Sequence, residues 1–135
     1  MNVIPFPEWR VYFYLDDEGR NAIRVWLEAH EIGPVDRWPL QGLIDFIEMA
    51  GPDMVGSSIV DLGDGIYGLS SARKGGTPIC LLFCHGPVGE TEITVLAAAE
   101  IDGKRLRPKY AKGIAEEHLE NLKRDSKRKR REPIT

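Results

Sequence analysis

The spacing of hydrophobic positions divides the chain into a helical first half and a strand-rich second half. Residues 9–15 are aromatic and β-branched, which predicts a first strand. Apolar residues then recur at helical spacing in two segments. We expect Asp16 or Asp17 to cap the first helix and Gly33-Pro34 to end it. The second helix is expected to begin near Trp38-Pro39.

From residue 58 onward the apolar positions alternate with a period of two, and glycine-containing turns separate the runs. This pattern predicts four more strands, at 58–62, 66–73, 77–85 and 91–101. The short glycine loops favour antiparallel hairpins, and a last helix is expected from about Lys109. Because helices and strands come in blocks, the fold class indicated is α+β. Two N-terminal helices would pack on a mostly antiparallel sheet of four to five strands, with a C-terminal helix.

Charge is distributed unevenly along the 135 residues, whose net charge is −3. Residues 1–103 carry 6 Lys/Arg and 16 Asp/Glu, whereas residues 104–135 carry 12 and 5. We expect one domain over residues 1–122. A basic tail over residues 123–135 would follow, either as a solvated extension of the last helix or disordered until it binds something. An acidic body with a basic end suggests a polyanionic partner.

The sequence favours a cytoplasmic protein without a metal or another cofactor. It has no apolar run of the ~20 residues that a membrane span needs and no recognisable secretory signal. Cys80 and Cys84 would lie about 13 Å apart on one face of a strand, beyond the ~7 Å limit for a disulfide. Free thiols are typical of a reducing compartment. His85 would point to the opposite face, so buried apolar cysteines are favoured over a metal site.

Three segments of the second half carry a resemblance to a known family. Residues 64–70 read Asp-Gly-Ile-Tyr-Gly-Leu-Ser, residues 74–76 form the turn Lys-Gly-Gly, and residues 103–108 read Gly-Lys-Arg-Leu-Arg-Pro before the last helix. With the order of elements, the stretch from Val60 to Leu122 resembles the RelE/ParE/HigB toxins, above all their phage-derived, HigB-like branch. One family signature, Glu-Leu-Arg, is Gly68-Leu69-Ser70 here, so its arginine is missing.

The resemblance implies a RelE-like fold and the toxin of a type II toxin–antitoxin system. Such a toxin would be an mRNA endoribonuclease that needs no metal, with RNA or the ribosome and a cognate antitoxin protein as partners. The missing arginine keeps an alternative open, a non-catalytic module of the same fold that inhibits a host protein such as gyrase. A phage nucleic-acid-binding regulator is a third interpretation, and the oligomeric state is left open.

Cleavage by the 2′-hydroxyl of RNA needs a base, a positive charge beside the phosphate and an acid for the leaving oxygen. The candidates for these roles are Lys104, Arg105, Arg107, Tyr110, Arg73 and His118. Further cations are expected to contact RNA: Lys74, Lys109, Lys112, Lys123, Arg124, Lys127, Arg128, Lys129, Arg130 and Arg131. The spacing of Tyr110 and His118 on the last helix also fits a stripe facing the core, which we favour for Tyr110. The remaining aromatic residues and histidines that we interpret as structural are Trp9, Trp26, Trp38, His30 and His85.

Overall fold

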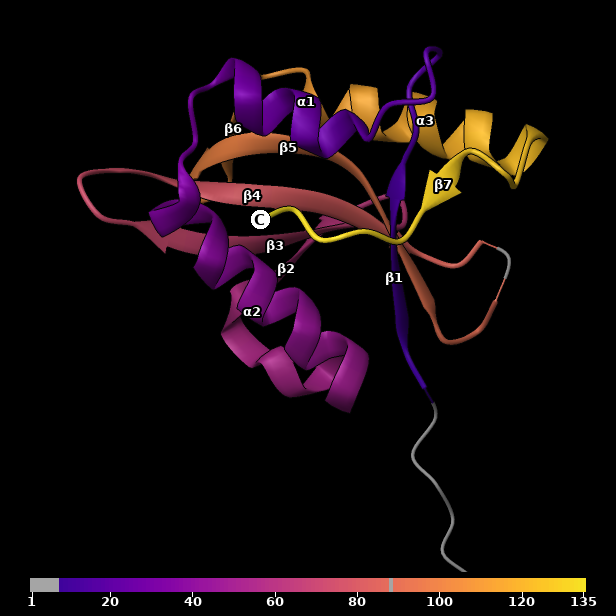
Figure 1. The fold of residues 1–135 in the computed structure, drawn as a ribbon, viewed down its shortest axis with the longest axis horizontal. Coiled ribbons are helices and arrows are strands. Elements are labelled where there is room, and N and C mark those ends of the chain that lie inside the picture. Colours follow the sequence, from indigo (N-terminus) through magenta and orange to yellow (C-terminus); the bar gives the residue numbers. More distant parts are fainter. Residues whose placement is uncertain (1–7, 88) are drawn as a thin grey trace, which may run out of the picture.

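A mixed β-sheet forms the centre of the computed structural model, which describes residues 8–87 and 89–135 (Figure 1). In this part of the chain the strand order is β2-β3-β4-β5-β1-β7, and β6 also pairs with β5. The strands are β1 (Arg10–Tyr14), β2 (Ile59–Gly63), β3 (Ile66–Arg73), β4 (Gly76–His85), β5 (Glu92–Asp102), β6 (Arg105–Arg107) and β7 (Lys129–Arg130). Neighbouring strands are antiparallel except β1, which runs parallel to β5.

Helices cover both faces of this sheet. They are α1 (Ala22–Ala29), α2 (Pro34–Ala50), the 3₁₀ segment η1 (Pro52–Ser58) and α3 (Ala111–Arg124). Buried side chains of α1 and α2 pack on one face, and those of α3 pack on the other (Figure 1). The α+β class is therefore confirmed. The sheet has more strands than the four to five predicted, because β6 and β7 are short and built largely of Lys and Arg, without an apolar alternation.

The central strands β4 and β5 are buried on both faces, as their continuous apolar runs predict. In β4, Leu81 and Phe83 face the α1–α2 side, whereas Cys80 and Cys84 face α3. Both cysteines are free and buried, and they share one face as expected from the period of two.

The first two helices begin at other residues than the sequence predicts. Asn21, not Asp16 or Asp17, caps α1, because its side-chain oxygen accepts from the N–H groups of Ile23 and Arg24. Asp16 instead closes the preceding turn by accepting from two backbone N–H groups at 2.9 Å. Helix α2 begins at Pro34, with Gly33 as its N-cap, so Gly33-Pro34 also opens a helix, and Pro39 lies inside it.

The C-terminal residues are part of the folded body, which corrects the expectation of a detached basic tail over residues 123–135. Strand β7 pairs with β1 and covers its outer edge. Ile134 is fully buried against the core between α2 and the sheet. Its N–H donates to Oε1 of Gln41 at 2.8 Å, and its carbonyl accepts from Arg37 at 3.1 Å. Figure 1 shows this yellow segment leaving α3, passing β1 and ending beside α2.

Candidate nucleic-acid interface

The basic loop between the last long strand and the last helix lines a pocket of about 730 Å³. Gly103, with a φ of 63°, turns the chain so that β6 pairs back on the end of β5. The alternation within β6 half-buries Leu106 and leaves Arg105 and Arg107 exposed. The pocket is lined by Leu62, Asp102, Lys104, Arg105, Leu106, Arg107, Lys109 and Lys112. The structure thus brings together five of the cations that the sequence proposes, and we call this the basic pocket.

The cations of the basic pocket differ in how far they are already neutralised. Lys112 lies 2.7 Å from Asp64, and their hydrogen bond raises the pKa of Lys112 and lowers the pKa of Asp64. Arg107 lies 3.4 Å from Glu100 and donates to the hydroxyl of Thr77 at 2.8 Å. Among the described residues, by contrast, Lys104, Arg105 and Lys109 form no ion pair, so their charges are available to a ligand; the three residues are exposed.

The N-terminus of α3 adds to the positive potential of the basic pocket. Tyr110 holds the N-cap position without a side-chain cap, and the first turn contains no acidic residue. The first N–H groups of a helix lack partners within it and carry a partial positive charge. An anion held by Lys104 and Arg105 would therefore also be attracted by the start of this helix.

A second pocket, of about 470 Å³, is also lined by Arg107 and is partly aromatic. Its lining residues are Trp26, His30, Glu100, Arg107, Pro108, Tyr110 and Ile114. The rings of Trp26 and His30 stack with their centroids 4.0 Å apart. Tyr110 is 69% exposed, so the prediction that it faces the core is wrong. We call this the aromatic pocket, and it shares Arg107 with the basic pocket.

His30 lines the aromatic pocket, although the sequence predicted only a structural role for it. Its Nδ1 lies 2.9 Å from the carbonyl oxygen of Trp26. A carbonyl can only accept, so Nδ1 carries the proton, and in the neutral ring Nε2 is an acceptor. The sequence does indicate that Trp26 and His30 are neighbours, because they are four residues apart on one helix face. Only the tertiary structure places that face beside Arg107 and Tyr110.

Three other candidates line neither pocket. His118 is half-buried, stacks on Tyr14 at 4.0 Å and lies with Nδ1 2.6 Å from the carbonyl of Leu96, so it anchors α3 to β5. Arg73 forms an ion pair with Asp36 at 3.3 Å, which ties the β3–β4 hairpin to α2. Lys74 is exposed in the turn of that hairpin. These positions give His118 and Arg73 structural roles.

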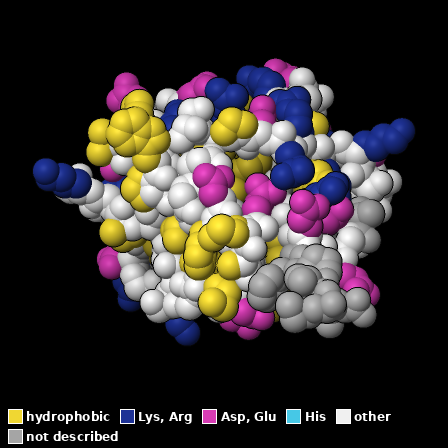
Figure 2. Space-filling view, turned by 60° about the horizontal axis from the view of Figure 1, so that its bottom comes forward, with side chains coloured by type: hydrophobic (Ala, Val, Ile, Leu, Met, Phe, Trp, Pro, Cys, Tyr) yellow, Lys and Arg dark blue, Asp and Glu magenta, His cyan; other side chains and the backbone are white. Residues whose placement is uncertain are grey.

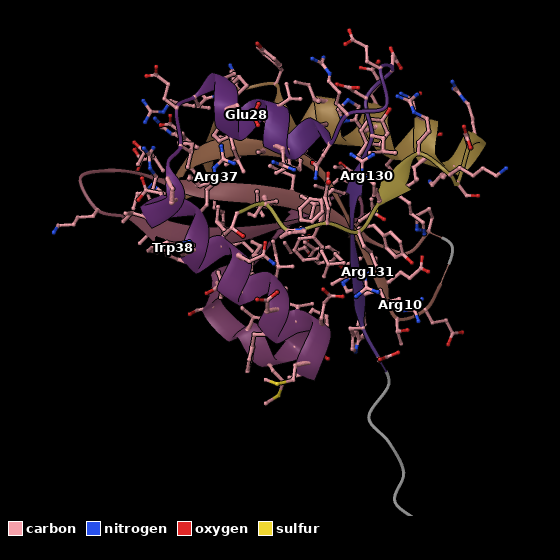
Figure 3. All side chains as sticks on the ribbon, viewed as in Figure 1. Arg10, Glu28, Arg37, Trp38, Arg130 and Arg131 are labelled. Carbon is pink, nitrogen blue, oxygen red and sulfur yellow. The ribbon has the colours of Figure 1, made fainter. Side chains whose placement is uncertain are left out.

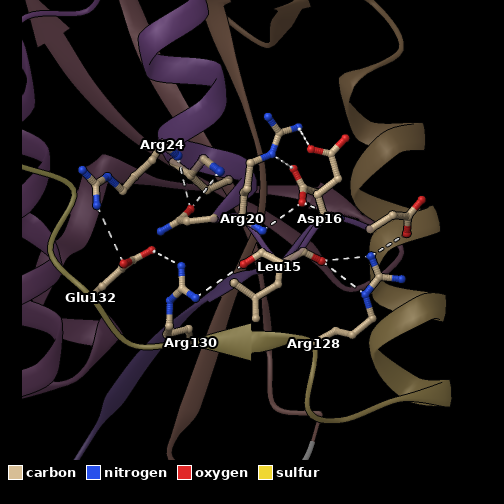
Figure 4. A network of polar contacts seen from close by, with 12 residues as sticks. Leu15, Asp16, Arg20, Arg24, Arg128, Arg130 and Glu132 are labelled. Carbon is tan, nitrogen blue, oxygen red and sulfur yellow. Dashed lines mark hydrogen bonds and ion pairs between the residues drawn. The ribbon is translucent and has the colours of Figure 1, made fainter.

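Most of the predicted RNA-binding cations of residues 123–131 are bound to carboxylates of the same chain. Lys129 lies 2.6 Å from Glu92, and its side chain is only 11% exposed. The remaining pairs are Arg128 with Asp17, Arg131 with Glu48, Arg130 with Glu132 and Lys123 with Glu120. Arg128 also donates to the carbonyl of Leu15, and Arg24 and Arg130 flank Glu132 (Figure 4). The basic C-terminus therefore neutralises the acidic body within the fold.

Gly68, which stands where the family that the sequence resembles has the glutamate of its Glu-Leu-Arg signature, lies in a crowded part of the sheet. A Cβ atom at Gly68 would lie 2.6 Å from Sγ of Cys80 and 3.3 Å from Val60. A side chain at this position of β3 is thus excluded by the packing against β4 and β2. Ser70, on the same face, is half-buried, and its hydroxyl lies 3.5 Å from the carbonyl of Ser58. Nothing in this stretch contributes a charge to the pockets.

No protein-family model matches the chain, and no curated protein is significantly similar to it in sequence. In the part of the chain that the structure describes, no helix is both long and apolar enough to cross a membrane. The same residues contain no group of three or more His, Cys, Asp or Glu side chains placed to hold a metal ion.

Proposed function

We propose that this protein binds single-stranded RNA across the basic and aromatic pockets and cleaves it there as a metal-independent endoribonuclease. The observation that carries the proposal is the sharing of Arg107 by a pocket rich in cations and a pocket lined by Trp26, His30 and Tyr110. Basic grooves with adjacent aromatic side chains are the usual means of holding single strands, through phosphate contacts and base stacking. A RelE/HigB-like toxin is the biological role that we favour for such an activity.

The phosphates would lie in the basic pocket. Lys104, Arg105 and Lys109 are exposed, and no ion pair of the described chain competes for them. A base would stack on Tyr110, whose ring is the most exposed aromatic surface beside Arg107. Such binding would depend on the RNA backbone more than on the RNA sequence, because phosphate contacts do not distinguish between bases.

Cleavage would take place where the pockets meet. Nε2 of His30 would take the proton of a 2′-hydroxyl, whose oxygen then forms a bond to the adjacent phosphorus. The bond from phosphorus to the 5′-oxygen breaks, and the hydroxyl of Tyr110 would give its proton to that oxygen. Arg107 would stabilise the charge that develops on the phosphate. The products would be a 2′,3′-cyclic phosphate and a free 5′-hydroxyl, and no metal enters the reaction.

An antitoxin would suit the same surface. A protein segment that carries several carboxylates would neutralise Lys104, Arg105 and Lys109 and exclude RNA from the basic pocket. The cations of residues 128–131 would not serve this purpose, because each already faces a carboxylate of its own chain. We therefore expect the antitoxin to compete directly with RNA.

Binding can be tested by the fluorescence anisotropy of a labelled uridine-rich RNA at several salt concentrations. Replacing Lys104, Arg105 and Lys109 together with alanine should weaken binding and reduce the slope of log K against log salt by about 2, since each single-strand phosphate contact contributes about 0.7. The control replaces Lys123, Arg124 and Lys127, three cations at the other end of α3. Equal losses in the two triple variants would contradict a localised site.

Cleavage can be tested with the same RNA and with mRNA on ribosomes, in the presence of EDTA. His30→Gln and Tyr110→Phe should abolish product formation while leaving RNA affinity within a factor of about 3. Glutamine is a polar side chain of similar length but a poor base, and phenylalanine keeps the ring without the hydroxyl, so both variants lose proton transfer. His85→Gln, a change of an exposed histidine outside both pockets, is the control. Intact RNA with the unaltered protein, with ribosomes supplied, would refute the enzymatic part of the proposal.

One observation favours a second candidate, a non-catalytic module that binds a host protein or a nucleic acid. The crowding at Gly68 and the half-buried Ser70 leave no charged side chain where the toxin family carries its Glu-Leu-Arg signature. Growth inhibition that persists after Lys104, Arg105, Arg107 and Tyr110 are all replaced with alanine would support this second function. Loss of inhibition with the same variant would support action through the pockets.

A further inference from the structure

Helix α2 exposes a row of large apolar side chains along its outer face. Val35 is 67% exposed, Trp38 62%, Phe46 36% and Met49 69%, whereas the inner face is buried against the sheet. Trp38, which the sequence analysis interpreted as a packing residue, lies on this outer face (Figure 3). The hydrophobic side chains form separate groups on the surface in Figure 2.

The row is symmetric about Gly42. Trp38 and Phe46 lie four residues before and after this glycine, and Val35 and Met49 lie seven residues before and after it. Steps of four and seven keep side chains on one face of a helix. A two-fold axis through Gly42, perpendicular to the helix, would therefore place Trp38 of one copy opposite Phe46 of the other, and Val35 opposite Met49. Such self-complementarity is what an interface between two identical subunits requires.

Nothing in residues 8–87 and 89–135 accounts for a glycine at position 42. A Cβ atom there would meet nothing within 4 Å, and the position has no positive φ. A mid-helix glycine lowers stability by about 1 kcal/mol relative to alanine. The close approach of a second helix would explain the glycine, because two helix axes come nearest where the side chains between them are small.

Two acidic residues that flank the row, Asp36 and Glu48, already have counter-charges. Asp45, which is exposed and hydrogen-bonded to Gln41, has no ion pair among the described residues. Asp36 and Glu48 lie six residues before and after Gly42, so the two-fold axis would bring them near each other. Asp36 is already paired with Arg73 at 3.3 Å, and Glu48 with Arg131 at 2.7 Å. Both therefore reach such an interface with their own counter-charges.

We infer that two copies of this chain form a dimer through an antiparallel α2–α2 contact that crosses at Gly42. The row and the neighbouring Met54, which is 64% exposed, present on the order of 500 Å² of apolar surface per copy. A standard interface buries about 800 Å² per partner. The interface is thus smaller than a standard one, and we expect the dimer to dissociate on dilution.

Sedimentation velocity at increasing protein concentration tests the dimer, starting from a monomer mass of 15.2 kDa. The unaltered protein should approach twice this mass at high micromolar concentration. Gly42→Gln should stay monomeric, whereas Gly113→Gln, the same change at an exposed and equally open glycine of α3, should dimerise normally. A monomer at every concentration overturns the inference, as does a dimer that survives Gly42→Gln.

The crossing point can be tested separately by cross-linking. The native thiols of Cys80 and Cys84 are buried, so a cysteine introduced by Gly42→Cys would be the only reactive one in the described chain. It should form an intermolecular disulfide on mild oxidation, because the axis places both copies of position 42 side by side. Gly113→Cys, at an exposed glycine of α3 on the opposite face of the sheet, is the control for random collisions. Equal cross-linking of the two variants would overturn the proposed geometry.

Discussion

Replacing Ile134 with alanine tests whether the C-terminal segment is part of the hydrophobic core or an electrostatic tail. The Ile134 side chain is fully buried and belongs to the core cluster of Phe13, Leu40 and Ile44. Truncating a buried isoleucine to alanine costs about 2–5 kcal/mol, and the cost is lower where the site can relax. Because Ile134 lies outside the helices and strands, where the backbone relaxes more easily, we expect about 2–3 kcal/mol.

Urea denaturation followed by circular dichroism measures this free energy of unfolding at a fixed protein concentration. The midpoint should fall without a change in slope, and the melting temperature should fall by roughly 8 °C for a protein of this size. Thr135→Ala is the matched control, because Thr135 is exposed and adjacent. Its effect should remain within about 0.5 kcal/mol.

A chain that ends at Ser126 should lose more stability than Ile134→Ala. It would uncover the edge of β1 and leave Glu92 and Glu48 without their cationic partners. If Ile134→Ala matches Thr135→Ala within about 0.5 kcal/mol, the segment contributes nothing to the core, and the interpretation of residues 123–135 as a separate tail would be restored.

Three further outcomes follow from the packing and the charges. Gly68→Ala should destabilise the protein by about 1–3 kcal/mol through overpacking, and adding Cys80→Ala should restore much of it in a double-mutant cycle, because the clash is with Sγ. Independent effects of the two changes would contradict this. Burial raises the pKa of Glu132, but its hydrogen bonds and the charges of Arg130 and Arg24 outweigh burial and lower it below 4.5. Its stabilising effect should therefore be complete above pH 4.5 and be lost as the pH falls through the lowered value, and Glu132→Gln should reduce this acid dependence of the unfolding midpoint. Burial raises the pKa of Cys80 to about 12 and that of Cys84 to about 11, so a thiol reagent at pH 8 should label neither in the native protein and both in urea, and rapid native labelling would disprove their burial.

The sequence predicted the long elements well because their signal is local. The alternation in 66–73 and the apolar run of 77–85 correspond to β3 and β4 within a residue. The start of α1 was misplaced because Asp16 and Asn21 have side chains of similar capping ability, and the path of the chain decides which of them closes a turn. The start of α2 was misplaced because Gly33-Pro34, expected only to end the first helix, also begins the second. The basic residues of β6, Arg105 and Arg107, were recognised as a candidate site because charge density is also a local property.

What the sequence determined by itself is therefore the α+β class, the buried central strands, the shared face of Cys80 and Cys84, and a cationic segment before the last helix. The tertiary structure alone decided which charges are available. Residues 123–131 have the densest positive charge in the chain, yet the parallel pairing of β1 with β5 creates an edge that β7 covers, and the carboxylates around that edge neutralise its cations. Lys104, Arg105 and Lys109 form no ion pair in the described part of the chain, because they are exposed on the loop that follows the turn at Gly103. The formation of an ion pair depends on contacts between residues far apart in the chain, which no local pattern encodes.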